Sequence, residues 1–310
     1  MKKISVLIPC YNEEGNIEPI SKAVEEELKK TCSQYDYEIC FIDNCSTDNT
    51  RSLIRDVCKK SKKIKAIFNA RNFGGLDSPY YGMQQLDGDC VILFSCDFQD
   101  PVDMIPKLVE EWEKGAKIVS CIKNKSDENK VVRFLRTCYY KLIKKMSEFE
   151  QIEHFTGFGL YDKSFIQVLC SLKDPLPWLR GIVADLGSHR VSINYKQAKR
   201  KSGKTHWNWY SLYDIAMRSF TSYTKVGLRI ATFSGAIIAF ASLLVAAFYF
   251  VYKLLHWDSM ATGIAPLVIG VFFLGAMQLF FIGFLGEYIM SINTRVMNRP
   301  LVIEEERINW

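Results

Sequence analysis

The sequence predicts an α/β protein with a doubly wound, mainly parallel sheet, followed by two transmembrane helices. Short apolar runs alternate with amphipathic stretches in the first part of the chain. Strands and helices that alternate at this spacing form parallel sheets. A polar loop follows each apolar run, and two long uncharged segments come later, at residues 230–252 and 259–286.

Five apolar runs are the expected strands, at residues 3–9, 37–42, 64–68, 91–94 and 117–122. Amphipathic helices are expected between them, ending near Lys30 and Lys60, with a short helix after Gly75 and another over residues 103–114. In a doubly wound sheet the loops that follow the strands meet at one edge. One crevice is therefore expected to collect Tyr11, Asp43, Arg71 and Asp97. The sequence contains neither a dinucleotide-binding glycine fingerprint nor a P-loop.

The loop after the fourth strand has the strongest chemical signal. Asp97, Gln99 and Asp100 follow the buried run, and Pro101 prevents the strand from continuing. Asp97 and Gln99 are two residues apart, so in extended backbone they point the same way and could share one cation. The alternative is a polar loop in which Asp97 caps the next turn. Three oxygen-bearing side chains at this place favour a functional site, with Mg²⁺ or Mn²⁺ as its metal.

The two uncharged segments are long enough to cross a membrane. At about 1.5 Å per residue the first spans roughly 34 Å, compared with a hydrocarbon core of about 30 Å. A buried core helix is the alternative, but neither segment has an amphipathic face. Lys225, Arg229, Arg295 and Arg299 flank their ends, whereas the connecting loop at residues 256–266 has no Lys or Arg. The positive-inside rule therefore places that loop outside.

These features predict a multi-pass protein of the cell inner (cytoplasmic) membrane. No cleavable signal peptide precedes the first strand, so the large domain is expected in the cytoplasm. The expected division is a cytoplasmic domain at 1–206, an interfacial amphipathic helix at 207–225, membrane helices within 226–291 and a cytoplasmic tail at 292–310. Ten cysteines without a Cys-x-x-Cys pair agree with reduced thiols. The modest net charge of +6 points to anionic lipid headgroups as partners, and no nucleic acid is expected.

Five ordered motifs resemble those of family 2 glycosyltransferases. They are PCYNEEGN at 9–16, IDNCSTDNT at 42–50, ARNFGG at 70–75, CDFQDP at 96–101 and RKSGKT at 200–205. The closer likeness is to the membrane-anchored polyprenyl-phosphate branch, which contains bactoprenol glucosyltransferases and dolichol-phosphate mannose synthase. LRIATFSG at 228–235 and FLGEYIMSI at 284–292 extend the likeness over nearly the whole chain.

The resemblance implies a GT-A fold and inverting transfer of a sugar from a nucleotide sugar, with a UDP-sugar favoured. It implies that Asp43 accepts hydrogen bonds from the base or ribose. The donor pocket is then lined by Pro9, Tyr11, Glu13, Asp43, Arg71 and Asp97. Asp97 and Gln99 match the family's metal ligands, and a divalent cation that bridges the two phosphates stabilises the departing diphosphate. For Arg71, a solvated surface charge is an equally favoured interpretation.

Three positions depart from the family pattern. Asn44 and Ser95 stand where Asp is usual, and Gly159 stands where the bactoprenol enzymes have an Arg. An inactive membrane scaffold is one interpretation of the first two departures. Asp97 and Gln99, which are intact, argue against it.

A basic amphipathic helix is expected over residues 130–147. An ordinary surface helix is the alternative, but a helix so rich in cations beside a membrane anchor favours a position on the membrane face. A polyprenyl phosphate could present its headgroup between this helix and the aromatic-rich segment 207–223. The candidates for holding that phosphate are Arg133, Arg136 and Arg200.

Two classes of acceptor remain open. A polyprenyl phosphate, such as undecaprenyl phosphate, is already ionised and needs no strong base, whereas a sugar hydroxyl must lose a proton. Asp185 lies near the position where hydroxyl-glycosylating relatives keep their base, and pairing with an Arg is its structural alternative. We favour the phosphate acceptor, with Asp97, Asp185 and Arg200 as the candidate catalytic residues. A homo-oligomer is left open.

Overall fold

The computed structural model describes residues 1–123, 152, 154–198, 209–223, 226–255 and 264–310. The described strands are β1 (Lys3–Cys10), β2 (Asp36–Asp43), β3 (Ile64–Asn69), β4 (Cys90–Leu93), β5 (Ile118–Lys123), β6 (Phe155–Asp162), β7 (Arg190–Tyr195) and β8 (Glu304–Ile308). The helices that surround the sheet are α1 (Ile17–Thr31), α2 (Thr50–Lys60), α3 (Gly74–Gln85), α4 (Met104–Glu113), α6 (Lys163–Leu172) and α7 (Leu179–Leu186). Three longer or more peripheral helices follow, α8 (Trp209–Tyr223), α9 (Val226–Leu255) and α10 (Ile264–Met297).

The eight described strands form one sheet in the order β7-β5-β6-β4-β1-β2-β3-β8. Strands β1, β2, β3 and β4 run parallel, as do β5 and β7. Strand β6 runs antiparallel between β4 and β5, and β8 runs antiparallel to β3. The predicted doubly wound, mainly parallel sheet is therefore confirmed. The five expected strands correspond to β1–β5, whereas β6, β7 and β8 were not predicted.

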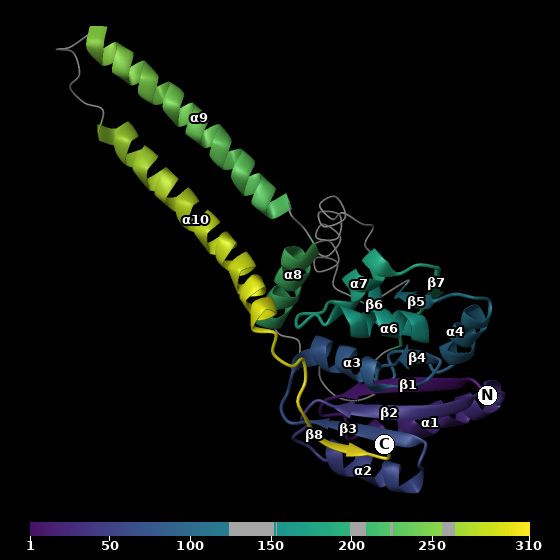
Figure 1. The fold of residues 1–310 in the computed structure, drawn as a ribbon. Helices are drawn as coiled ribbons and strands as arrows, with labels where there is room; N and C mark the ends of the chain where they lie inside the picture. Colours follow the sequence, from purple (N-terminus) through teal and green to yellow (C-terminus); the bar gives the residue numbers. More distant parts are fainter. Residues whose placement is uncertain (124–151, 153, 199–208, 224–225, 256–263) are drawn as a thin grey trace.

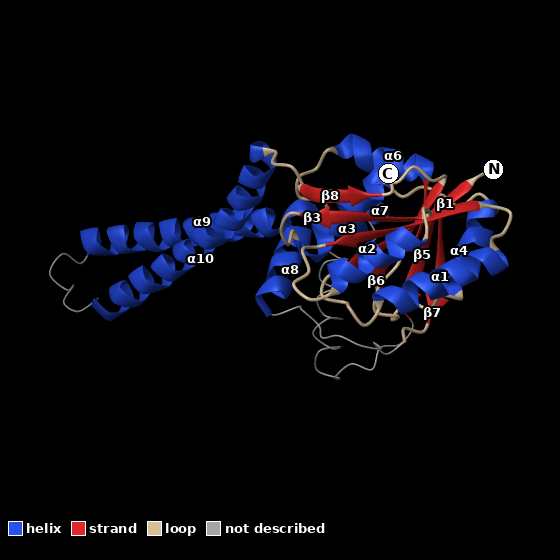
Figure 2. Ribbon diagram, turned by 90° about the horizontal axis from the view of Figure 1, so that it is seen from below, coloured by secondary structure: helices blue, strands red, loops and turns tan. Residues whose placement is uncertain are grey.

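Both faces of the sheet are covered by helices (Figure 2). Side chains of β1 alternate between the two layers, because Val6 and Ile8 pack with helices α1, α2 and α4, whereas Leu7 packs with α3, α6 and α7. Burial on both faces explains why the central strands read as continuous apolar runs. Because β1, β2, β3 and β4 run parallel, their carboxyl ends lie at the same end of the sheet, where the polar loops begin.

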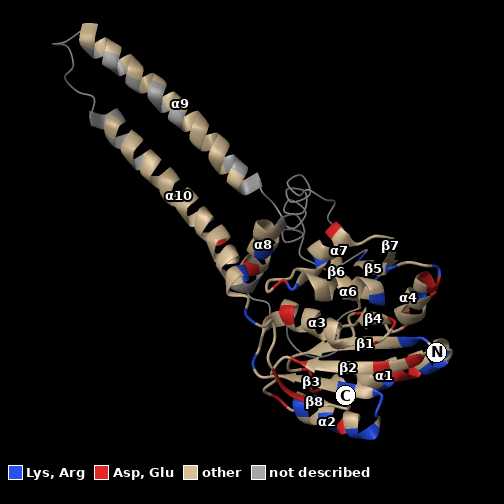
Figure 3. Cartoon of the chain, in the orientation of Figure 1, with Lys and Arg blue, Asp and Glu red and all other residues tan. Residues whose placement is uncertain are grey.

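Helices α9 and α10 form an antiparallel hairpin that projects away from the sheet (Figures 1 and 2). Residues Phe273–Met297 of α10 are long and apolar enough to cross a membrane, and their apolar window is not buried inside the protein. Among the described residues, this is the one helix that passes that test. One of the two expected membrane helices is thus supported, and a crossing by α9 stays a prediction. Figure 3 shows charged residues of α10 near its end beside α8.

Helix α8 occupies the segment where an interfacial helix was expected and packs on α10. The ring of Phe220 lies 5.7 Å from that of Phe284, between centroids, and Tyr213 donates a hydrogen bond to Glu287 (2.8 Å). Arg218 joins α8 to the sheet domain by an ion pair with Asp77 of α3 (2.6 Å). The hairpin of α9 and α10 is thereby connected to the domain through α8.

The C-terminal tail is folded, which the sequence did not predict. The expected tail begins inside α10, which continues to Met297, and the chain then returns to the sheet. Strand β8 pairs with the exposed edge of β3, with Arg307 opposite Ile67. The last residues therefore lie beside the first part of the chain.

Candidate active site

The loops after β1 and β2 are joined by a series of hydrogen bonds. The backbone N–H of Asn12 donates to Ser46 Oγ (2.9 Å), and its side-chain oxygen accepts from the N–H of Thr47 (2.8 Å). The N–H of Glu13 donates to Thr50 Oγ1 (2.9 Å). Asn12 has a positive φ of 55°, a conformation that Asn adopts more readily than most residues. These contacts bring the segment from Pro9 to Glu13 beside the end of β2.

Asp43 is fully buried at the end of β2. Its carboxylate accepts a hydrogen bond from the N–H of Ser46 (3.1 Å) and another from Arg51 Nε (2.9 Å). A buried carboxylate is costly unless it is paired and hydrogen-bonded, and Arg51 supplies the opposite charge. Burial alone would lower the pKa of Arg51, but its hydrogen bond to Glu305 and its attraction to Asp43 outweigh burial and raise the pKa.

Asn44 is the centre of an amide network that joins the loops after β2 and β3. Its Nδ2 donates to Asn72 Oδ1 (2.9 Å) and to the carbonyl of Gly74 (3.1 Å). Its Oδ1 accepts from Asn69 Nδ2 (3.1 Å) and from the N–H of Phe73 (2.9 Å). An Asp at this position could not donate to two acceptors, so the departure from the family pattern has a structural reason here.

Arg71 lies on the loop that this network holds. Its side chain is exposed, its guanidinium stacks over the ring of Phe73 at 4.1 Å, and it donates to the carbonyl of Asn72 (3.3 Å). These contacts agree equally with the two interpretations of Arg71, as a solvated surface charge and as a residue near the nucleotide.

Asp97 follows β4 at the same edge and is buried. Its Oδ1 accepts from the N–H of Gln99 (3.1 Å), and the intervening Phe98 has a positive φ of 59°. The Gln99 side-chain oxygen accepts from Gln197 Nε2 (3.2 Å), and its carbonyl accepts from the N–H of Ala198 (3.1 Å). The segment after β7 is thus attached to the loop that contains Asp97.

Asp100 holds the loop that contains Asp97 in place through hydrogen bonds. It is buried and accepts hydrogen bonds from the backbone N–H (3.1 Å) and hydroxyl of Ser95 and from the hydroxyl of Tyr195 (2.9 Å). Burial raises the pKa of Asp100, its hydrogen bonds act in the opposite direction, and the charge of Asp97 raises it further. Ser95, at the second position that departs from the family pattern, therefore holds Asp100.

The donor set fits a hard divalent cation only as a partial site. No group of three His, Cys, Asp or Glu side chains that could hold a metal is found in the described part of the chain. Asp97 and Gln99 offer one carboxylate and one amide oxygen, which are ligands of the type that Mg²⁺ and Mn²⁺ prefer. Mg²⁺ sites commonly use one or two carboxylates together with water and substrate phosphates. The pair therefore fits a cation that arrives with a diphosphate.

The third departure, Gly159, is explained by packing. It lies in the middle of β6, opposite Leu93 and Ser120. A Cβ atom there would lie 2.3 Å from the carbonyl oxygen of Val119. An Arg at this position would require the strands to move apart.

Asp185 lies away from these groups. Helix α7 begins near Gly157 at the carboxyl ends of the parallel strands, and Gly187, which follows its last residue, packs on Ile118, the first residue of β5. Because β5 is parallel to β4, the first residue of β5 lies at the amino ends of these strands, opposite the carboxyl end of β4 that Asp97 follows. The structure therefore does not bring Asp185 beside Asp97.

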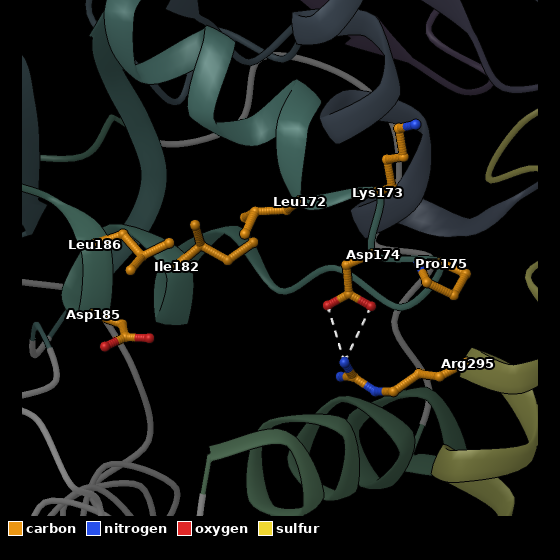
Figure 4. A pocket seen from close by; sticks show the side chains of 8 residues that line it. All are labelled: Leu172, Lys173, Asp174, Pro175, Ile182, Asp185, Leu186 and Arg295. Carbon is orange, nitrogen blue, oxygen red and sulfur yellow. Dashed lines mark hydrogen bonds and ion pairs between the residues drawn. The ribbon is translucent and has the colours of Figure 1, made fainter.

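Asp185 instead lines a cavity of about 330 Å³ between α6, α7 and α10. Figure 4 shows it across the opening from Arg295, whose partner is Asp174 (3.2 Å). Arg295 also donates to Ser222 Oγ of α8 (2.9 Å). The expected pairing of Asp185 with an Arg is not found among the described residues.

The three candidate acceptor residues, Arg133, Arg136 and Arg200, lie outside the described residues, as does the expected basic helix. Ala198, which is bonded to Gln99, precedes Arg200 by two positions.

Sequence reasoning missed the residues that support the site from other elements, chiefly Arg51, Tyr195 and Glu305. Arg51 follows the loop motif directly and lies in the first turn of α2, a signal that could have been used. Glu305 gave no signal, because its place depends on the return of the tail to β3.

Comparisons with known proteins agree with the motifs. Residues 5–169 match the family described as Glycosyl transferase family 2. The SfII prophage-derived bactoprenol glucosyl transferase of Shigella flexneri is 32% identical over 304 residues, with 97% of each chain covered. The bactoprenol glucosyl transferase of Shigella phage SfV is 31% identical over 309 residues, with 98% of this chain and 99% of that one covered.

Proposed function

The chain belongs to glycosyl transferase family 2 and is a glycosyltransferase with a GT-A-like fold, and from this premise we propose its substrates. It transfers a sugar, with inversion, from a nucleotide sugar to a polyprenyl phosphate such as undecaprenyl phosphate. A UDP-sugar is the favoured donor, and the product serves modification of cell-envelope glycans. The observation that carries the proposal is the likeness to bactoprenol glucosyl transferases over 97% of the chain, membrane hairpin included.

The donor nucleotide binds at the carboxyl edge of the sheet. Asp43 accepts hydrogen bonds from the base or ribose, and the loop from Pro9 to Glu13 forms the neighbouring wall. Arg71 lies on the third loop of the same edge. The support for this assignment is that hydrogen bonds hold these loops together around one buried carboxylate.

Asp97 and Gln99 hold Mg²⁺ or Mn²⁺ against the donor diphosphate. When bound, the cation offsets the negative charge that grows on this leaving group. Asp100, Ser95 and Tyr195 hold the loop in place, so that Asp97 is positioned before the substrate arrives.

The acceptor attacks with a phosphate oxygen. That oxygen forms a bond to the anomeric carbon while the bond from this carbon to the diphosphate breaks, and the electron pair leaves with the diphosphate. The nucleophile is already ionised, so it needs cations that position it rather than a base. Arg133, Arg136 and Arg200 are the proposed cations.

The lipid reaches the enzyme at the inner membrane, which α9 and α10 both cross. The catalytic domain and the tail lie in the cytoplasm. Support comes from the apolar surface of α10 and from β8, which pairs with β3 in the same sheet. A chain that leaves and rejoins one sheet must cross the membrane an even number of times.

The alternative acceptor is a hydroxyl of a lipid-linked glycan, with Asp185 as general base. The position of Asp185 at the far end of α7 gives this alternative less support. Loss of a general base typically costs about 10²–10⁴-fold in rate. Asp185→Asn should therefore lose activity on that scale only if a hydroxyl attacks.

The test is an assay of the purified full chain with undecaprenyl phosphate as sole acceptor and a panel of radiolabelled UDP- and GDP-sugars. We expect a labelled lipid product from one donor, with nearly unchanged turnover for Asp185→Asn. Transfer to a glycan hydroxyl but never to the lipid phosphate would overturn the proposed acceptor.

A further inference from the structure

The C-terminal strand reaches the donor site through one arginine. Arg51 donates from Nε to Asp43 (2.9 Å) and from its terminal nitrogen to Glu305 of β8 (2.8 Å). The same terminal nitrogen donates to the carbonyl of Asn69 (3.0 Å). Arg51 is thus fixed between the buried carboxylate and the tail that follows the membrane hairpin.

We propose that Arg51 and Glu305 are positioning residues for nucleotide binding, with Glu305 holding the Arg51 guanidinium and Arg51 orienting Asp43. The inference rests on the proposed function, in which Asp43 contacts the donor nucleotide. It adds that residues from the far end of the chain set the geometry of this contact.

The burial of the three groups gives the reason for the arrangement. The Asp43 side chain is fully buried, that of Arg51 is 20% exposed and that of Glu305 is 53% exposed. A charge as exposed as Glu305 contributes little to stability, because water screens its ion pair. The effect of Glu305 is instead to restrict the long, flexible side chain of Arg51 to one orientation.

Asp43 needs such an orientation because it must present a free lone pair to a ligand. Ser46 and Arg51 both reach Oδ2, and only a longer contact of 3.4 Å reaches Oδ1. Oδ1 therefore retains acceptor capacity. A guanidinium that moved to bind both oxygens would remove that capacity, and Glu305 and Asn69 hold it away from this position.

The neighbouring ion pair provides a matched control. Arg55, one turn along α2, pairs with Glu306 of the same strand at 2.7 Å. Both arginines lie over the ring of Phe68, at 5.3 Å for Arg51 and 4.6 Å for Arg55. The two pairs join the same elements, but among the contacts described only the first continues to Asp43.

The experiment measures the dissociation constant of UDP, or of GDP if the wild type binds only GDP, on the full chain in detergent. The variants are Asp43→Asn, Arg51→Gln and Glu305→Gln, with Arg55→Gln and Glu306→Gln as controls. We expect Arg51→Gln to weaken binding about tenfold, the size of one lost hydrogen bond to a charged group. Glu305→Gln should weaken binding by about threefold. Both variants should raise KM for the sugar donor and leave kcat close to wild type. Glu305→Gln should also leave the thermal midpoint close to wild type, whereas Arg51→Gln should lower it, because it leaves the buried carboxylate of Asp43 without its ion-pair partner.

Five outcomes are distinguishable. Weaker binding in the first pair with unchanged controls supports the proposal, and so does a double variant Arg51→Gln, Glu305→Gln no weaker than Arg51→Gln alone. Equal losses in both pairs would mean that the tail acts only by holding the fold, which overturns it. Weaker binding by Asp43→Asn with normal binding by Arg51→Gln and Glu305→Gln overturns the inference and leaves the proposed function standing. Normal binding by Asp43→Asn refutes the donor contact itself.

Discussion

At the scale of single residues, Asn44 shows how one side-chain atom can decide a local structure. Its amide donates twice and accepts twice, and its four partners lie between the end of β3 and the first residue of α3. Two acceptors surround Nδ2 and two donors surround Oδ1, so only one orientation of the amide makes all four hydrogen bonds. The network then sets the start of α3 and the position of the loop that contains Arg71.

Asn44→Asp should destabilise the protein although it restores the residue usual in the family. The new carboxylate oxygen would face Asn72 Oδ1 and the carbonyl of Gly74, two acceptors with no donor between them. We expect a loss of about 1–3 kcal/mol in the free energy of unfolding, measured by urea titration of the full chain in detergent. Asn194→Asp, on an exposed position of β7, is the control and should change stability little. Equal stability of Asn44→Asp and wild type would contradict the network.

Asp97→Ala should abolish transfer while the fold remains intact. Removal of the single carboxylate of the proposed metal site should cost at least about 100-fold in kcat/KM, since a bound cation contributes several kcal/mol to charge stabilisation. The measurement is transfer to undecaprenyl phosphate, with circular dichroism to check the fold. Asp103→Ala changes an exposed carboxylate nearby that makes no capping bond, and it should retain activity.

Chelation provides the second half of this test. EDTA should stop transfer by the wild type, and added Mg²⁺ or Mn²⁺ should restore it. Full activity in EDTA would refute the metal assignment.

At the scale of elements, Asp162 joins β6, α4 and α6. It is the N-cap of α6 and accepts from the N–H of Ser164 (3.0 Å), from Trp112 Nε1 (2.7 Å) and from Lys117 Nζ (3.1 Å). Burial opposes its ionisation, but the hydrogen bonds from Ser164, Trp112 and Lys117 outweigh burial and lower the pKa of Asp162 to about 2. One carboxylate therefore joins three elements by hydrogen bonds.

Asp162→Ala should lower the free energy of unfolding by about 2–4 kcal/mol, because it removes a cap and leaves the buried indole N–H without an acceptor. The effect should depend on pH. A lowered pKa means that the stabilisation is complete above the ordinary value of 3.8 and is lost as pH falls through about 2. The difference in thermal midpoint between wild type and variant should be constant from pH 7 to pH 5 and should shrink below about pH 4. A difference that grew on acidification would contradict the assignment.

At the scale of the whole molecule, the sequence predicts what depends on local patterns. Strands β1 to β4 are rich in apolar residues because both faces are buried, and the sites of Asp43 and Asp97 follow from their places at the carboxyl ends of such strands. Strand β8 could not be predicted, since Glu304–Ile308 is mostly charged and its partner lies near the start of the chain. Glu305 reaches Arg51 only through that long-range pairing.

Strand β6 was missed for a different reason. Its two glycines, Gly157 and Gly159, weaken the strand pattern. The structure needs Gly159 because the carbonyl of Val119 occupies the space of a side chain. Because the backbones of β5 and β6 approach closely there, the position must be Gly, and Gly weakens the strand pattern in the sequence. Asp185, which resemblance suggested as a base, lies at the end of a helix whose direction no local pattern encodes.

The last prediction is that residues 1–225 and the tail lie on the same side of the membrane. Arg307 pairs with Ile67 in the sheet, so the chain must return to the side from which it left. If α10 crosses the membrane once, another segment must cross in the opposite direction. Helix α9, with 30 residues and its uncharged segment at residues 230–252, is the described helix with the length to do so.

A cysteine introduced at Thr262 should be labelled by a membrane-impermeant maleimide in intact cells, because it lies in the loop between the two crossings. A cysteine at Arg307 should react only after the cells are permeabilised, and Cys170, which is exposed on α6, provides the internal control for the cytoplasmic side. Labelling at both 262 and 307 in intact cells would mean an odd number of crossings. That result would be incompatible with β8 in the sheet, and it would refute the two-crossing topology together with the role proposed for Glu305.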